Sequence, residues 1–129
     1  MSIERSELKV LVVDDSDFSR SIISQMVKEA GFQVVGEAPG ADVALAMVRE
    51  KAPHVVITDI VMPNVSGIEL TEKLSKDFDE IGVIVVSSLS QEHIVLEAIG
   101  AGARDFIAKP ISPEQLTESL DKLRSEIEA

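Results

Sequence analysis

The 129-residue sequence contains no cysteine, no tryptophan and no tyrosine, and four phenylalanines supply its aromatic content. The absence of cysteine excludes disulfides, thiolate zinc sites and a cysteine nucleophile. Basic residues are also scarce: 12 lysines and arginines stand against 23 acids, which gives a formal net charge of −11. Because a surface this acidic repels phosphate backbones, we expect no nucleic-acid partner.

Long hydrophobic runs are missing as well. No apolar run approaches the ~20 residues needed to cross a bilayer, and the N-terminal segment, with Glu4 and Glu7, lacks the pattern of a signal peptide. We therefore expect no membrane partner and a cytoplasmic location. The 45% apolar content is typical of a folded globular domain. The length predicts a single domain over residues 1–129, with its core at about residues 8–127.

Short apolar runs alternate with amphipathic segments along the chain. The runs cover residues 10–13, 34–35, 55–57, 83–86 and 106–108. They are mostly β-branched and lack polar alternation, which is typical of strands buried on both faces. Between them, apolar residues recur at helical spacing, at positions 18, 22, 26 and 30, at 41, 45 and 48, at 70 and 74, and at 116, 120, 123 and 127. Five strand–helix repeats predict an α/β fold, an open parallel sheet with helices on both faces.

Helix boundaries are indicated by capping residues. Ser16, Ser66 and Ser90 are expected to cap the first, third and fourth helices. The last helix is expected to begin after Ser112, with proline at its first position and Gln115 completing a capping box. Gly31 and Gly102 are expected to end the first and fourth helices.

Polar residues gather where the predicted strands end, which is where ligands bind in open parallel sheets. Asp14 and Asp15 follow the first run, Asp59 the third, Ser87 the fourth and Lys109 the fifth. Converging carboxylates are stable when a lysine or a hard divalent cation such as Mg²⁺ neutralises them. A lysine and a hydroxyl suit phosphoryl oxygens, and a carboxylate can accept a phosphoryl group. The set predicts a Mg²⁺-dependent phosphoryl-transfer site with an aspartate acceptor.

The segments that carry these residues are 10–16 (VLVVDDS), 59–63 (DIVMP) with Gly67 in the following turn, 85–88 (VVSS) and 101–110 (AGARDFIAKP). In this order they resemble the receiver domains of response regulators in two-component signalling, and most of all the stand-alone chemotaxis-type (CheY-like) regulators. The resemblance extends from about Leu8 to Ile127. It implies a doubly wound (βα)5 sheet with strand order 2-1-3-4-5.

The resemblance also implies a role for each site residue. Asp59 would accept a phosphoryl group from a sensor histidine kinase, a phosphotransfer protein or a small acyl phosphate. Mg²⁺, or Mn²⁺ in its place, would be held by Asp15, Asp59 and the backbone carbonyl of Val61, with Asp14 acting through water. Lys109 would pair with Asp59 and then with the phosphoryl group.

A conformational switch is part of the same resemblance. Ser87 would move toward the phosphoryl oxygens and Phe106 would turn inward with it, which would change the face made by the fourth helix, fifth strand and fifth helix. The Lys109–Pro110 peptide is expected to be cis. The apolar side chains of Val61 and Leu89 flank the site and should hinder an attacking water, so we expect them to slow dephosphorylation.

The resemblance predicts a signalling switch that catalyses its own phosphorylation and dephosphorylation and is not an enzyme acting on a substrate pool. Its output partner would be a protein such as the flagellar motor switch or another chemotaxis component. A monomer is expected, and dimerisation on phosphorylation stays open. Two alternatives remain: a receiver belonging to a larger transcriptional or enzymatic regulator, and an aspartate-nucleophile phosphatase suggested by Asp15-Ser16-Asp17. Phe18 is either a core residue or a contact for the phosphoryl donor.

Overall fold

Strands and helices alternate along residues 2–127, which are the residues that the computed structural model describes. After a short 3₁₀ helix, Arg5–Glu7, the elements are β1 (Lys9–Val13), α1 (Asp17–Glu29), β2 (Gln33–Ala38), α2 (Ala41–Lys51), β3 (Val55–Asp59), α3 (Gly67–Asp77), β4 (Gly82–Ser87), α4 (Glu92–Gly100), β5 (Asp105–Ala108) and α5 (Pro113–Ser125). No helix in this part of the chain is long and apolar enough to cross a bilayer.

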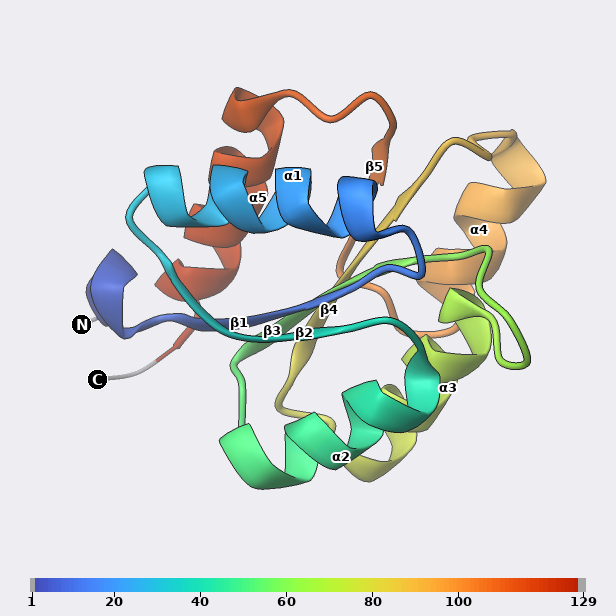
Figure 1. The fold of residues 1–129 in the computed structure, drawn as a ribbon, viewed down its shortest axis with the longest axis horizontal. Helices are drawn as coiled ribbons and strands as arrows, with labels where there is room; N and C mark the ends of the chain where they lie inside the picture. Colours follow the sequence, from blue (N-terminus) through green and yellow to red (C-terminus); the bar gives the residue numbers. More distant parts are fainter. Residues whose placement is uncertain (1, 128–129) are drawn as a thin grey trace.

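The strands form a parallel sheet in the order β2-β1-β3-β4-β5. Helices α1 and α5 cover one face, and α2, α3 and α4 lie on the other (Figure 1). Both the fold class and the strand order predicted from the sequence are confirmed. All the strands therefore end at the same edge of the sheet, so residues far apart in sequence are brought together there.

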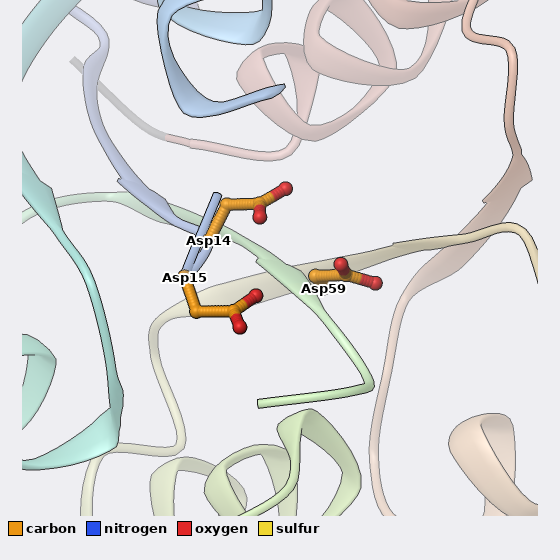
Figure 2. Close-up of side chains that lie close together, drawn as sticks. All are labelled: Asp14, Asp15 and Asp59. Carbon is orange, nitrogen blue, oxygen red and sulfur yellow. The ribbon is translucent and has the colours of Figure 1, made fainter. Parts of the chain in front are cut away.

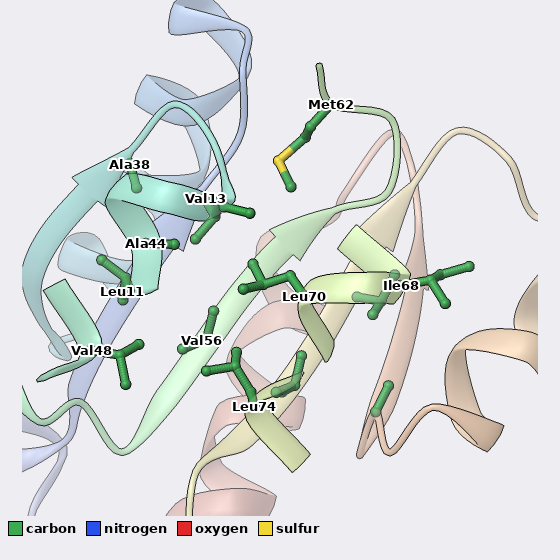
Figure 3. Close-up of a cluster of buried hydrophobic side chains, with 14 of the residues drawn as sticks. Leu11, Val13, Ala38, Ala44, Val48, Val56, Met62, Ile68, Leu70 and Leu74 are labelled. Atoms are coloured by element: carbon green, nitrogen blue, oxygen red, sulfur yellow. The ribbon is translucent and has the colours of Figure 1, made fainter. Parts of the chain in front are cut away.

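Two hydrophobic cores fill the space between the sheet and its helices. Because successive side chains of a strand point to opposite faces, Val10 and Val12 pack beneath α1 and α5, whereas Leu11 and Val13 pack beneath α2 and α3. In the core on the side of α2 and α3, Val56 of the sheet packs against side chains of both helices (Figure 3). The central strands are thus buried on both faces, which fixes the register of the residues at their ends.

The edge strands are less buried than the sequence pattern indicated. In β2 the side chains from Gln33 to Glu37 are exposed or half-buried, and in β5 Ile107 is the fully buried position. The prediction that both strands are buried on both faces was wrong. These strands lie at the two ends of the sheet order, so solvent reaches them from the side.

Side-chain caps begin three of the helices as predicted. The hydroxyls of Ser16, Ser66 and Ser112 accept hydrogen bonds from the backbone three residues further on, at 3.2, 3.2 and 3.1 Å. The predicted cap of α4 by Ser90 was wrong, since Gln91 occupies the N-cap position and makes no side-chain cap bond. The Gln115 carbonyl accepts from the Ser112 hydroxyl, at 3.4 Å, and does not complete the expected capping box.

The apolar stripe predicted along α1 is not its buried face. Phe18 is 77% exposed and Ile22 is 40% exposed, while Ile23 and Val27 contact the sheet. The four-residue spacing is correct for a helix, but the core-facing stripe is shifted by one residue. Phe18 is therefore a surface residue, which removes the core interpretation.

Candidate functional site

Three carboxylates meet at the carboxyl edge of the sheet. Asp14 and Asp15 directly follow β1, and Asp59 is the last residue of the neighbouring strand β3. One oxygen from each lies within 4.8 Å of the others. Figure 2 shows the Asp14 and Asp15 side chains leaving consecutive residues, with both carboxylates on the side toward Asp59. Asp14 is fully buried and Asp15 is exposed, so the cluster opens to solvent on one side.

Backbone groups and an arginine hold Asp14 in place. Its Oδ1 accepts a hydrogen bond from the Ser16 amide at 2.9 Å, and its own amide donates to the Ala38 carbonyl at 3.0 Å. The Arg20 guanidinium donates to the Asp14 carbonyl at 2.7 Å and also contacts Glu37 at 3.5 Å. Arg20 thus ties the end of β1 to the end of β2, a role that the sequence analysis missed.

The ammonium group of Lys109 lies among these carboxylates. Its Nζ is 3.1 Å from Asp14 Oδ2, 3.3 Å from Asp59 Oδ2 and 2.9 Å from the Ser19 hydroxyl. The Lys109 amide donates to the Ser87 carbonyl at 2.9 Å, and the following Lys109–Pro110 peptide is cis. The lysine is thus anchored to β4 by its backbone while its side chain reaches the ends of β1 and β3.

The carboxyl group of Asp59 experiences opposing electrostatic effects in this cluster. Burial raises the pKa of its carboxyl group, and the charge of Asp14 adds to this effect. The ammonium of Lys109 and a hydrogen bond from the Ile60 amide, 2.8 Å from Oδ1, lower the pKa of Asp59 in opposition but do not cancel the burial. Ionised Asp59 is therefore short of positive charge, and a cation added beside it is attracted.

The donor set fits a hard divalent cation. All the ligand atoms that the three carboxylates offer are oxygens, which Mg²⁺ prefers. Because Asp15 is exposed, there is also room for the water molecules that Mg²⁺ retains. Mn²⁺ accepts the same oxygen donors. The residues present are therefore compatible with the metal expected from the sequence.

The remaining candidate residues belong to β4, to β5 and to the loops that follow β3 and β4. Ser87 is buried at the end of β4, where its hydroxyl accepts from the Leu89 amide at 3.0 Å. Phe106 is half-buried in β5, next to Val85 in the register and packed against the core of α2 and α3. The side chains of Val61 and Leu89 are 60% and 36% exposed.

A groove runs along α1 beside the lysine. It has a volume of about 530 Å³, and its lining includes Phe18, Ile22, Pro110 and Ile111, with Ser19 and Lys109 also contributing. The exposed stripe of α1 is thus continuous with the acidic site. The sequence analysis missed Ser19, which lies one helical turn before the buried Ile23 and so turns toward the sheet. No sequence signal identified this face of the helix, because Ile22 and Ile23 are both apolar.

A parallel sheet in the order 2-1-3-4-5, with a cluster of carboxylates at its carboxyl edge, defines a doubly wound α/β protein of the flavodoxin-like kind. Within that class, residues 10–121 match the model of the response regulator receiver domain. The chain belongs to this family, and is a CheY-like receiver domain of two-component signalling.

Individual relatives agree with this assignment. The chemotaxis protein CheY of Thermotoga maritima is 38% identical over 115 residues, which cover 89% of this chain and 96% of that protein. The receiver domain of Thermotoga maritima CheB is 38% identical with a TM-score of 0.80, covering 95% of this chain and 98% of that one. The CheX–CheY–BeF₃–Mg²⁺ complex from Borrelia burgdorferi contains a chain with a TM-score of 0.86 and 25% identity, covering 94% and 90%.

Proposed function

We propose that this receiver domain is a phosphorylation-activated switch whose phosphoryl acceptor is Asp59. The observation that carries the proposal is the position of the Lys109 ammonium, 3.1 Å from Asp14 and 3.3 Å from Asp59 beside the three-carboxylate cluster. A lysine and a cation-binding cluster at one carboxylate are what phosphoryl transfer to that carboxylate requires.

In the proposed reaction an Asp59 oxygen attacks the phosphorus of a phosphohistidine or a small acyl phosphate. The new P–O bond forms as the P–N or P–O bond of the donor breaks, and the leaving group retains the electron pair. Asp14, Asp15, Asp59 and the backbone carbonyl of Val61 would hold Mg²⁺, with Asp14 acting through a water molecule. Bound there, the metal supplies positive charge to the phosphoryl oxygens. Lys109, whose Nζ is 3.3 Å from Asp59 Oδ2, would neutralise the same oxygens.

The signal would leave the site through Ser87. Its hydroxyl accepts from Leu89 in the present structure, so its own proton is free to be donated to a phosphoryl oxygen. Movement of Ser87 toward Asp59 would make space behind it for the half-buried ring of Phe106. The face formed by α4, β5 and α5 would then change, and an output protein would recognise it.

The proposed partners follow from the groove and from the relatives. A phosphoryl donor must cover Lys109, and the exposed Phe18 and Ile22 beside it offer apolar contact area for a sensor histidine kinase or phosphotransfer protein. The similarity to chemotaxis proteins supports an output in motility control, such as the flagellar motor switch or another chemotaxis component. The domain would act as a monomer before phosphorylation.

The test is the intact mass of the protein after incubation with acetyl phosphate, with and without Mg²⁺. We expect a Mg²⁺-dependent gain of one phosphoryl group in the wild type and none in Asp59→Asn. Asp77→Asn, a change of the same kind at an exposed position on α3, should behave as the wild type. An adduct that persists in Asp59→Asn would contradict the assignment of the acceptor.

The lifetime of the phosphorylated form gives a second prediction. Val61 and Leu89 are exposed apolar residues, each two positions after a site residue, Asp59 and Ser87 respectively, so they should exclude a hydrolytic water from the phosphoryl group. In the Val61→Asn, Leu89→Glu double variant, polar groups replace this shield, and we expect dephosphorylation about tenfold faster. The measurement is the decay of the phosphorylated mass after removal of donor. An unchanged rate would show that these residues do not shield the site.

A further inference from the structure

The side chain of Lys109 has a third partner that is not a carboxylate. Besides Asp14 and Asp59, its Nζ contacts the Ser19 hydroxyl at 2.9 Å, which is the shortest of the three distances. An ammonium group has three N–H donors. Here each donor has one oxygen acceptor, so the position of the group is fully specified by the protein.

The three acceptors differ in what phosphorylation requires of them. Asp14 and Asp59 belong to the cluster that would bind the metal, and Asp59 is also the proposed acceptor. Metal binding offsets the negative charge of these carboxylates, which weakens their hold on the lysine. The Ser19 hydroxyl belongs to α1, takes no part in the cluster and keeps its lone pairs throughout.

We infer that Ser19 is a positioning residue for phosphoryl transfer, and this inference rests on the proposed function. Its hydroxyl holds the Lys109 ammonium beside Asp59 when Mg²⁺ is bound to the carboxylates. The lysine is therefore already in place when the phosphoryl donor binds. Its location supports the role: the Ser19 backbone is fixed in the first turn of α1 by donation to the Ser16 hydroxyl. The hydroxyl is therefore held by a rigid element and not by a loop.

The chain offers a matched control on the same helix. The Ser24 hydroxyl is buried and has no hydrogen-bond partner among the described residues. Ser19→Ala and Ser24→Ala therefore both remove a hydroxyl group from α1. The Ser19 hydroxyl contacts the Lys109 ammonium, whereas the Ser24 hydroxyl has no partner among the described residues. Ser19→Thr restores the hydroxyl and should restore the function.

The first measurement is the rate of phosphorylation by acetyl phosphate at saturating Mg²⁺, together with the Mg²⁺ dissociation constant from calorimetry. We expect the rate of Ser19→Ala to fall about fivefold, the effect of one modest hydrogen bond, while its Mg²⁺ affinity changes less than about twofold. Ser24→Ala and Ser19→Thr should match the wild type in both. A wild-type rate in Ser19→Ala, or an equal loss in Ser24→Ala, would overturn the inference.

A second measurement does not depend on phosphorylation. In ¹⁵N-labelled, Mg²⁺-saturated protein, a tethered Lys109 ammonium should exchange its protons with water slowly enough to be detected by NMR. We expect this signal in the wild type and Ser24→Ala and its loss in Ser19→Ala. No such signal in the wild type would overturn the tether, even if acetyl phosphate modifies Asp59. If Asp59 is not modified but the signal follows this pattern, the tether stands and the proposed function fails.

Discussion

The two ends of the parallel strands treat charge differently. At the carboxyl ends, Asp14, Asp15 and Asp59 gather around the ammonium of Lys109, and Asp14 is wholly buried. Beyond the amino ends, opposite charges meet in pairs at the surface. Arg5 and Arg124 both contact Asp121, at 2.6 and 3.1 Å, and Arg104 pairs with Glu126.

The difference is visible in two aspartates. Burial raises the pKa of Asp59, whereas Asp121 is also partly desolvated but has its pKa lowered by hydrogen bonds from Arg5 and Arg124. An acid with a raised pKa opposes folding once the pH exceeds its usual value, and one with a lowered pKa favours folding there. At neutral pH the ionised carboxylate of Asp59 therefore lowers the free energy of unfolding, and that of Asp121 raises it.

Contacts at the amino edge also hold the N-terminal segment against α1 and α5. The Arg5 guanidinium donates to the Ala30 carbonyl at the end of α1 and lies 5.3 Å from the centre of the Phe32 ring, and Arg124 donates to the Ile3 carbonyl. These contacts tie α1 and α5 to the N-terminal segment.

The largest effect is expected where the backbone of the site is crowded. Gly67, the first residue of α3, lies so close to the end of β3 that an added Cβ would come within 1.8 Å of the Asp59 carbonyl oxygen. Gly67→Ala must therefore displace either α3 or the acceptor aspartate. We expect a loss of about 3 kcal/mol in the free energy of unfolding, the upper range for overpacking, measured by urea denaturation.

Gly100→Ala is the control, because a Cβ at Gly100 meets nothing within 4 Å and that residue ends α4 away from the carboxylates. It should change the free energy of unfolding by less than about 1 kcal/mol. Residual folded Gly67→Ala protein should also bind Mg²⁺ more weakly in calorimetry. Equal stability of the two variants would mean that the site edge tolerates displacement as readily as the surface does.

One substitution made at both edges should have effects of opposite sign. Asp59→Asn removes an ionised carboxylate whose burial is not fully compensated, so we expect the free energy of unfolding to rise by about 1 kcal/mol in metal-free protein at pH 7. Asp121→Asn removes two ion pairs, and we expect a decrease of about 1 kcal/mol. Urea unfolding in the presence of a chelator, followed by circular dichroism, measures both.

Changes of the same sign in these two variants would refute the electrostatic contrast between the edges. Added Mg²⁺ sharpens the test. It should stabilise the wild type more than Asp59→Asn, since a cation bound to the folded state stabilises it more when it binds more tightly. It should leave the difference between Asp121→Asn and wild type unchanged.

How far the sequence predicts this arrangement depends on the edge. At the carboxyl edge, buried strands end in Asp14 and Asp59, so the parallel fold alone brings these residues together. The Lys109 contacts to Ser19 could not be foreseen, because a serine on a polar-looking helix carries no sign of the partner that folding brings to it. The side on which α1 packs was also misjudged: both Ile22 and Ile23 are apolar, and only packing decides between them.

Few sequence signals indicate the contacts at the amino edge. Arg5 and Asp121 are 116 residues apart and belong to unremarkable charged segments. Pairs of this kind depend on where the end of one helix meets the N-terminal segment, which no local pattern encodes. His54 makes a contact of the same unforeseen kind: its Nδ1 accepts a hydrogen bond from the Lys9 amide at 2.9 Å.

The smallest predicted effect concerns this histidine. Burial lowers the pKa of His54, and the charge of Lys9 lowers it further, so the folded protein holds the ring neutral with Nδ1 as acceptor. The unfolded chain binds a proton near the usual pKa of 6.5 and the folded chain does so only at lower pH. The contribution of neutral His54 to the free energy of unfolding is therefore present above pH 6.5 and is lost as the pH falls through the folded-state pKa.

We expect wild-type stability to decrease by up to about 1 kcal/mol, the worth of one hydrogen bond, as the pH falls from 7 to 5. His54→Asn offers an oxygen acceptor to the Lys9 amide and does not titrate, so its decrease over this range should be smaller. His93→Asn, on the exposed side of α4, should follow the wild type. If all three proteins lose stability equally, His54 contributes nothing to the pH dependence of stability. The electrostatic contrast between the amino edge and the carboxylate site would then depend only on the ion pairs of the amino edge.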